Sequence, residues 1–130
     1  MEKEKFKIRL SKDKLISVKG KKYVISLPNG EKVEVFTHRQ RARKIDGKLT
    51  GSYWCVTDLE SGLQIVGKYE YVSLMSELYK NTEESAITCA ITKMRINVTE
   101  SKLTFSELRE KAMKRIQERE TEKNGRNLYE

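Results

Sequence analysis

The chain is short of the residues on which recognisable catalytic and metal sites most often depend. Its 130 residues include one histidine, two cysteines, one proline and one tryptophan. Cys55 and Cys89 lie far apart in the sequence and lack the CxxC spacing of zinc sites and redox motifs. This spacing argues against a disulfide framework and predicts two buried free thiols. We therefore expect neither a metal nor a cofactor.

Catalytic motifs are missing as well. The single histidine, His38, stands near no HExxH, GxSxG, GxxxxGK[ST] or GxGxxG pattern. A nucleophilic pair of Cys55 with His38 would need an activating environment and an oxyanion site, and the sequence indicates neither. Glu83 and Glu84 stand at the expected start of a helix, where carboxylates favour the helix dipole. The sequence therefore predicts a non-enzymatic protein without catalytic residues.

Long apolar runs are absent too. No stretch is long enough to span a bilayer, and the first ten residues lack the apolar core of a secretory signal. We expect a cytoplasmic protein that has no membrane partner. Hydrophobic residues make up 37% of the chain in patterned runs, which favours a folded protein despite a charged fraction of 35%. The length suits a single α+β domain, expected over residues 1–122, with a polar C-terminal tail at residues 123–130.

Acidic residues are scarce in the first part of the chain. Residues 1–50 hold 15 lysines and arginines against 6 acidic residues, a balance of +9, whereas the whole chain carries +8. A protein that imitates DNA needs an acidic surface, so this excess argues against DNA mimicry and favours a phosphate-rich or acidic partner. The scattered lysines Lys3, Lys5 and Lys7 are more simply interpreted as solubilising charges.

Two β-hairpins are expected. The run "KKYVISLPNGEKVEVFT" surrounds Asn29-Gly30, a dipeptide typical of a type I′ turn, which would pair Tyr23 with Phe36 and Val24 with Val35. The second hairpin turns between Asp58 and Gly62. A short edge strand is expected at residues 15–18, ended by Gly20.

The apolar period then changes to that of helices. Two short helices and one longer helix are expected. Their apolar positions are Tyr71, Leu74 and Leu78 in the first, Ile87, Ala90, Ile91 and Met94 in the second, and Phe105, Leu108, Ala112 and Ile116 in the third. Thr104 and Glu107 form a capping box at the start of the third helix. The fold class is therefore α+β, an antiparallel β-sheet of hairpins followed by two or three helices.

Arginines at alternate positions make the segment "THRQRARKIDGKLTGSYW" the main candidate for nucleic-acid binding. A turn at Asp46-Gly47 would place Arg39 opposite Trp54 and Arg41 opposite Ser52, with the arginines on one face about 6.6–6.8 Å apart. Such a β-arm suits phosphate contacts, and Trp54 could carry Arg39 on its indole or stack a base. The candidate nucleic-acid contacts are Arg39, Arg41, Arg43, Lys44 and Lys48, with Lys21 and Lys22 as outer contacts.

Other interpretations of this segment stay open. Residues 38–51 would also suit a solvated loop or a short helix, and Trp54 would also suit core packing. The run "KYVISLPNGEKVEVFT", with a further strand and a helix, resembles the small DNA-binding arm domain of tyrosine recombinases, which implies a three-stranded sheet packed on a helix. The resemblance covers about half the chain, and the second half contains no recombinase catalytic residues.

Two function classes follow. The first is a small basic binding protein that contacts DNA or RNA through a basic loop or β-arm at residues 38–48. The second is a phage or mobile-element accessory protein that inhibits a host nucleic-acid-processing or defence enzyme by protein–protein binding, as anti-CRISPR proteins do. The partner would accordingly be nucleic acid or a nucleic-acid-binding host protein.

Overall fold

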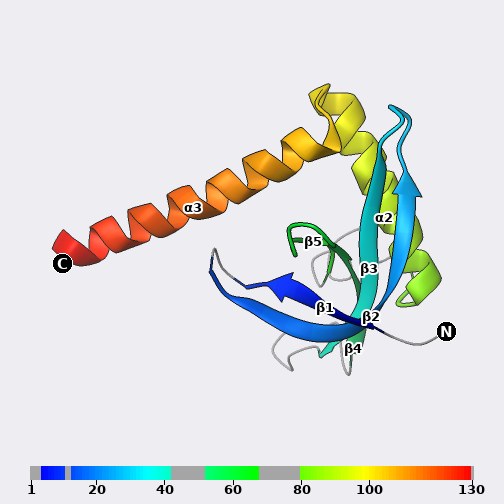
Figure 1. Cartoon of the computed structure of the whole chain (residues 1–130), viewed down its shortest axis with the longest axis horizontal. Helices are drawn as coiled ribbons and strands as arrows, with labels where there is room; N and C mark the ends of the chain where they lie inside the picture. Colours follow the sequence, from blue (N-terminus) through cyan, green and yellow to red (C-terminus); the bar gives the residue numbers. More distant parts are fainter. Residues whose placement is uncertain (1–3, 11–12, 42–51, 68–79, 130) are drawn as a thin grey trace.

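The computed structural model describes residues 4–10, 13–41, 52–67 and 80–129, with side chains described as far as residue 119. In this part of the chain, five antiparallel strands form one sheet in sequence order, and two helices follow (Figure 1). The elements are β1 (Glu4–Arg9), β2 (Leu15–Ser26), β3 (Lys32–Arg41), β4 (Ser52–Asp58), β5 (Gln64–Val66), α2 (Glu83–Ser101) and α3 (Phe105–Tyr129). The predicted α+β class is confirmed. The sheet has more strands than the three implied by the resemblance to recombinase arm domains.

Strand β2 does not end at Gly20 as predicted but bends there. Its first half pairs with β1 from Leu15 to Gly20, and its second half pairs with β3 from Lys21 onward. A Cβ atom on Gly20 would lie 2.3 Å from the carbonyl oxygen of Thr37, so only glycine lets the two strands approach this closely. The predicted strand at residues 15–18 is therefore the start of a longer strand, and β1 forms the sheet edge.

The β1–β2 ribbon folds back across one face of the sheet. Phe6 stacks on the buried Phe36 with ring centroids 4.8 Å apart. The backbone N–H of Arg9 donates to the carbonyl of Gly62 in the β4–β5 turn at 2.8 Å. The sheet therefore curls until β1 contacts the β4–β5 turn. The hairpin predicted between Asp58 and Gly62 is confirmed, because β4 pairs with β5.

The β2–β3 hairpin differs by one residue from the predicted type I′ register. Tyr23 pairs with Val35 instead of Phe36. The Gly30 N–H donates to the Leu27 carbonyl at 3.0 Å, and Gly30 has a φ of 91°. Proline, with φ fixed near −65°, suits the first central position of a type I turn, so the turn forms one residue earlier than predicted. The predicted pairings of this hairpin were therefore wrong.

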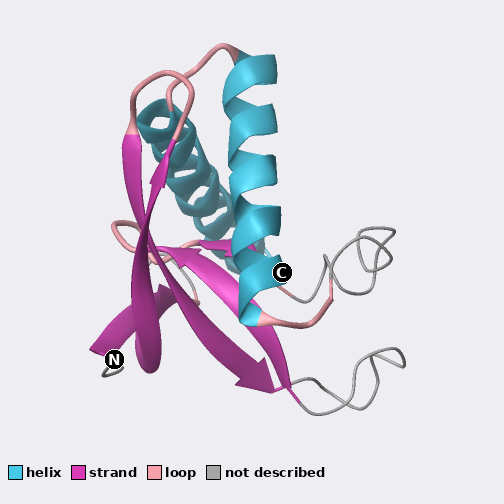
Figure 2. Ribbon diagram, turned by 90° about the vertical axis from the view of Figure 1, so that its right-hand side faces the viewer, coloured by secondary structure: helices cyan, strands magenta, loops and turns pink. Residues whose placement is uncertain are grey.

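Helix α2 covers the other face of the sheet (Figure 2). Thr82 caps its start by accepting the Ser85 N–H at 3.2 Å, and Lys102 ends it with a left-handed φ of 59°. The helix predicted around residues 83–94 is confirmed and extends to Ser101. Both cysteines are buried and form no disulfide, as predicted. The buried core combines Ile25, Val33, Val35, Val56 and Val66 of the sheet with Ala86, Cys89, Ala90, Met94 and Val98 of α2. The helix predicted around residues 71–78 lies outside the described residues.

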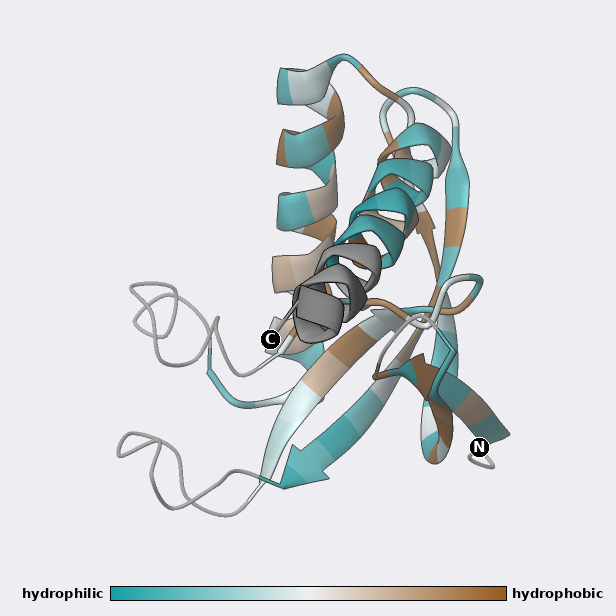
Figure 3. Cartoon of the chain, turned by 90° about the vertical axis from the view of Figure 1, so that its left-hand side faces the viewer, coloured by the Kyte–Doolittle hydropathy of each residue, from teal (hydrophilic) through white to brown (hydrophobic). Residues whose placement is uncertain are grey.

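Helix α3 is attached at its first turns and then extends away from the sheet (Figure 1). The predicted capping box is confirmed, because Glu107 N–H donates to Thr104 Oγ1 and Thr104 N–H donates to Glu107 Oε1, both at 3.1 Å. Glu31 of the β2–β3 hairpin also accepts the N–H of Phe105 at 2.6 Å. From these turns to residue 119, α3 is mostly hydrophilic (Figure 3). Its backbone stays helical through residues 123–129, the segment for which we expected a polar tail. Neither helix in the described part of the chain combines the length and apolarity needed to span a bilayer.

Candidate nucleic-acid interface

The register of β3 with β4 places two of the candidate arginines as predicted. Arg39 pairs with Trp54, and Arg41 pairs with Ser52. Because alternate residues of a strand share a face, both arginines lie on the same face of the sheet, about 6.6 Å apart along the strand. Both are exposed. The other candidates of this segment, Arg43, Lys44 and Lys48, lie outside the described residues.

The two candidate lysines of β2 lie on opposite faces. Lys21 pairs with Thr37 and so shares a face with Arg39. Lys22 pairs with Phe36 on the reverse face, and its Nζ forms an exposed ion pair with Glu34 at 2.7 Å. The structure therefore brings Lys21 together with Arg39 and separates both from Lys22.

A pocket of about 410 Å³ opens where β2 bends away from β3. It is lined chiefly by Lys19, Lys21, Thr37, Arg39, Trp54 and Glu83. Lys19 was missed in the sequence because we expected the strand to stop at Gly20. A strand continuing through Gly20 would have placed Lys19 and Lys21 on one face, two residues apart.

Trp54 contacts both the hydrophobic core and the charged guanidinium of Arg39. It lies partly buried against the core, and the Arg39 guanidinium sits over its indole ring at 5.4 Å from the centroid. Asn81, just before α2, accepts the Trp54 backbone N–H at 3.0 Å and donates to the Ser52 carbonyl at 2.9 Å. These contacts fix the strand that carries the indole. Of the two alternatives given for Trp54, the structure has Arg39 stacked on its indole, which limits the directions in which the guanidinium can point.

Glu83 is the single acidic residue that lines the pocket in the described part of the chain. Its Oε1 accepts hydrogen bonds from the Tyr23 hydroxyl and, at 3.4 Å, from Thr37 Oγ1. Burial, together with the bond to Glu83, raises the pKa of Tyr23 and keeps the phenol a neutral donor. The Glu83 carboxylate is thus engaged by two hydroxyls, while Lys19, Lys21 and Arg39 leave the pocket with an excess of positive charge.

His38 lies beneath this surface and is 1% exposed. Its Nε2 lies 2.8 Å from Thr57 Oγ1, and its Nδ1 has no hydrogen-bond partner among the described residues. The pKa of His38 is lowered to about 4, because burial disfavours the charged imidazolium by more than the Arg39 backbone favours it. The imidazole is therefore neutral near pH 7 and adds no charge to the pocket.

The pairing of His38 with Cys55 does not create a nucleophile–base contact of the kind considered from the sequence. The two residues stand opposite each other in the β3–β4 register. However, Cys55 Sγ lies 3.5 Å from Gln40 Oε1, whereas the His38 ring bonds Thr57. Within the described residues, no three His, Cys, Asp or Glu side chains cluster as metal ligands would.

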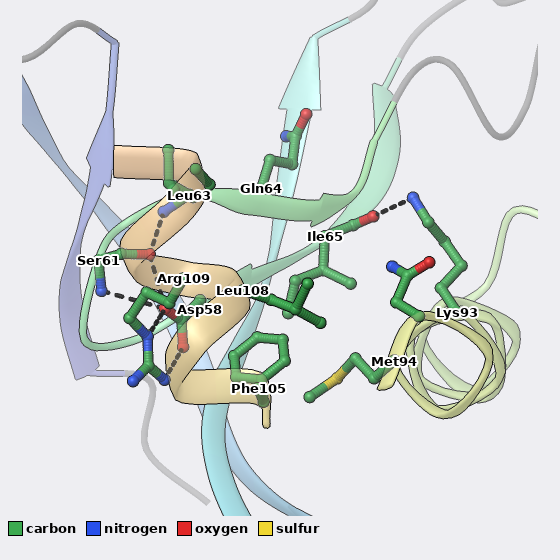
Figure 4. Close-up of a pocket in the computed structure, with 12 residues that line it drawn as sticks. Asp58, Ser61, Leu63, Gln64, Ile65, Lys93, Met94, Phe105, Leu108 and Arg109 are labelled. Atoms are coloured by element: carbon green, nitrogen blue, oxygen red, sulfur yellow. Dashed lines mark hydrogen bonds and ion pairs between the residues drawn. The ribbon is translucent and has the colours of Figure 1, made fainter. Parts of the chain in front are cut away.

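A second cavity, of about 270 Å³, lies between α2, α3 and the β4–β5 turn (Figure 4). Two of its charged side chains, Arg109 and Lys93, already serve the fold. Arg109 binds Asp58 through two hydrogen bonds, Nε to Oδ2 at 2.7 Å and Nη2 to Oδ1 at 2.9 Å. Lys93 Nζ donates to the Ile65 carbonyl at 2.6 Å. This cavity is part of the seam that attaches α3, so the basic pocket is the better candidate site.

Comparison with known proteins identifies no relative: no protein-family model, no curated protein and no solved structure matches this chain.

Proposed function

We propose that this protein is a small basic, non-enzymatic binding protein that contacts the phosphate backbone of nucleic acid. The proposed contacts are Lys19, Lys21, Arg39 and Arg41, together with Arg43, Lys44 and Lys48 from outside the described residues. A cytoplasmic location, where nucleic acid is accessible, belongs to the same proposal.

The observation that carries the proposal is the convergence of Lys21 and Arg39. They are 18 positions apart in the sequence, yet both line one pocket, and Lys19 joins them there. Basic side chains on one face neutralise successive phosphates and release the counterions bound to them, which supplies most non-specific affinity for nucleic acid. Lysine acts as a point charge, whereas the guanidinium of Arg39, oriented on Trp54, can donate two parallel N–H groups to one phosphate.

A salt titration of binding tests the proposal. Fluorescence anisotropy with labelled DNA and RNA probes should give affinities that fall steeply with salt for the parent protein. Replacing Arg39, Arg41 and Arg43 with alanine should weaken binding to unrelated sequences. It should also flatten the log-affinity against log-salt slope by roughly 2–3, because each lost duplex contact is worth about 0.9 and each single-strand contact about 0.7.

Lys22→Ala is a single-charge control, because Lys22 is adjacent to Lys21 but lies on the reverse face. It should leave the slope nearly unchanged. Absence of binding by the parent at low salt, or an unchanged slope in the arginine variant, would contradict the proposal. Inhibition of a host nucleic-acid-processing enzyme by protein binding would then be the better account, and a pull-down with parent and arginine variant would test it.

A further inference from the structure

The register of the β1–β2 ribbon sorts its side chains into an apolar face and a basic face. Phe6 and Ile8 point to the inner face, where Phe6 stacks on Phe36 and Ile8 is 6% exposed. Because side chains alternate along a strand, this packing directs Lys5 and Lys7 to the outer face. Both lysines are exposed there. Their orientation therefore follows from the core contacts of their neighbours.

On the outer face, like charges stand directly opposite each other. Lys5 pairs with Lys19 across the ribbon, and Lys7 pairs with Ser17. Among the residues that pair in β1 and β2, no acidic side chain shares the outer face, since Glu4 pairs with Gly20 in the inner set. Directly opposed like charges destabilise a strand pair unless an anion compensates them. The arrangement thus costs folding energy that a bound polyanion would recover.

The basic ribbon joins the proposed interface at Lys19. Lys19 pairs with Lys5 in the ribbon and also lines the pocket with Lys21 and Arg39. The basic side chains therefore lie on two strand pairs that both reach the pocket, β1–β2 with Lys5, Lys7 and Lys19, and β3–β4 with Arg39 and Arg41. The positive surface is two-pronged, and the pocket lies at its base.

We propose that this two-pronged surface binds double-stranded nucleic acid, with Lys5, Lys7 and Lys19 as a second set of phosphate contacts. The inference rests on the proposed function and names its ligand class. Proteins that bind single strands combine basic grooves with aromatic stacking platforms. Among the described residues, the outer face of the ribbon carries no aromatic side chain, and the indole of Trp54 is covered by Arg39. Contacts made by cations alone suit the closely spaced phosphates of a duplex.

The experiment compares a duplex of about 16 base pairs, roughly one and a half turns, with a single strand of the same sequence and length. The parent should prefer the duplex. The variant K5A/K7A/K19A should flatten the duplex salt slope by about 2.7, three contacts at about 0.9 each. The charge-matched control K22A/K32A/K114A removes exposed lysines that lie outside the two-pronged surface and should flatten the slope by less than about 1. Because the ribbon variant relieves repulsion, its thermal midpoint should be equal to or above that of the parent.

Different outcomes separate the two proposals. Parent protein that binds neither polymer at low salt overturns both. Parent protein that binds the duplex while K5A/K7A/K19A keeps the parental slope leaves the proposed function standing and overturns the ribbon contacts. Tighter binding of the single strand than of the duplex overturns the assignment of the ligand class.

Discussion

Burial of His38 makes the stability of the fold depend on pH. In the unfolded chain the imidazole titrates near its ordinary pKa of 6.5, whereas burial lowers its pKa in the folded protein to about 4. Between these values the unfolded state binds a proton that the folded state does not, so stability falls as pH is lowered through this window. At about 1.36 kcal/mol for each unit of pKa, the loss amounts to about 3 kcal/mol. His38 contributes no further loss below pH 4.

Urea unfolding at a series of pH values from neutral to acidic measures this loss. His38→Gln is the informative variant, because glutamine can still hydrogen-bond Thr57 but does not titrate. The parent should lose about 3 kcal/mol more than the variant over the window. Comparison of the two proteins cancels the contribution of carboxylates such as Glu31. Desolvation opposes a lower pKa of Glu31, but its hydrogen bonds with Phe105, Asn29 and Ser106 together lower it. Equal losses in both proteins would show that His38 is not buried as a neutral imidazole.

Three further substitutions test how the elements are joined, each measured as the free energy of unfolding in denaturant. Leu108→Ala should cost about 2 kcal/mol, the low end for a buried leucine, because Leu108 is only partly buried; no measurable change would mean that α3 does not dock here. Arg109→Ala should cost about 3 kcal/mol, because it leaves the buried carboxylate of Asp58 without its cation. A cost below about 1 kcal/mol, as for an exposed ion pair, would contradict a role for the Arg109–Asp58 pair in holding α3. Gly20→Ala should cost at least about 2 kcal/mol, because the new Cβ would meet the Thr37 carbonyl; a neutral result would refute the tight bend of β2.

Strand length and turn residues in the sequence predicted one of the two strand registers at the candidate site. The Arg39–Trp54 register followed from extending the strand that begins at Lys32 to a turn at Asp46-Gly47, and that register is confirmed. The β2–β3 register differs from the prediction, which rested on Asn29-Gly30 alone and took no account of Pro28. Proline restricts the backbone more strongly than Asn-Gly favours positive φ, and so it decided the turn.

The role of Gly20 depended on distant contacts. In the sequence a glycine after an apolar run is typical of a strand end, but here it permits close approach to β3. A strand that ends at Gly20 leaves Lys19 outside the predicted site, and the sequence alone favours a solubilising role for Lys5 and Lys7. Their common face with Lys19 emerges only when β1 pairs with β2.

Nuclear magnetic resonance of the side-chain N–H groups tests the central claim most directly. The chain has a single tryptophan, so one indole N–H signal reports on the pocket. Addition of duplex at low salt should shift the Trp54 indole and Arg39 Nε–H signals, while the Nε–H of Arg109, held by Asp58 at the α3 seam, stays in place. Shifts at Arg109 with none at Trp54 and Arg39, or no shifts at any of the three, would contradict nucleic-acid binding at this surface.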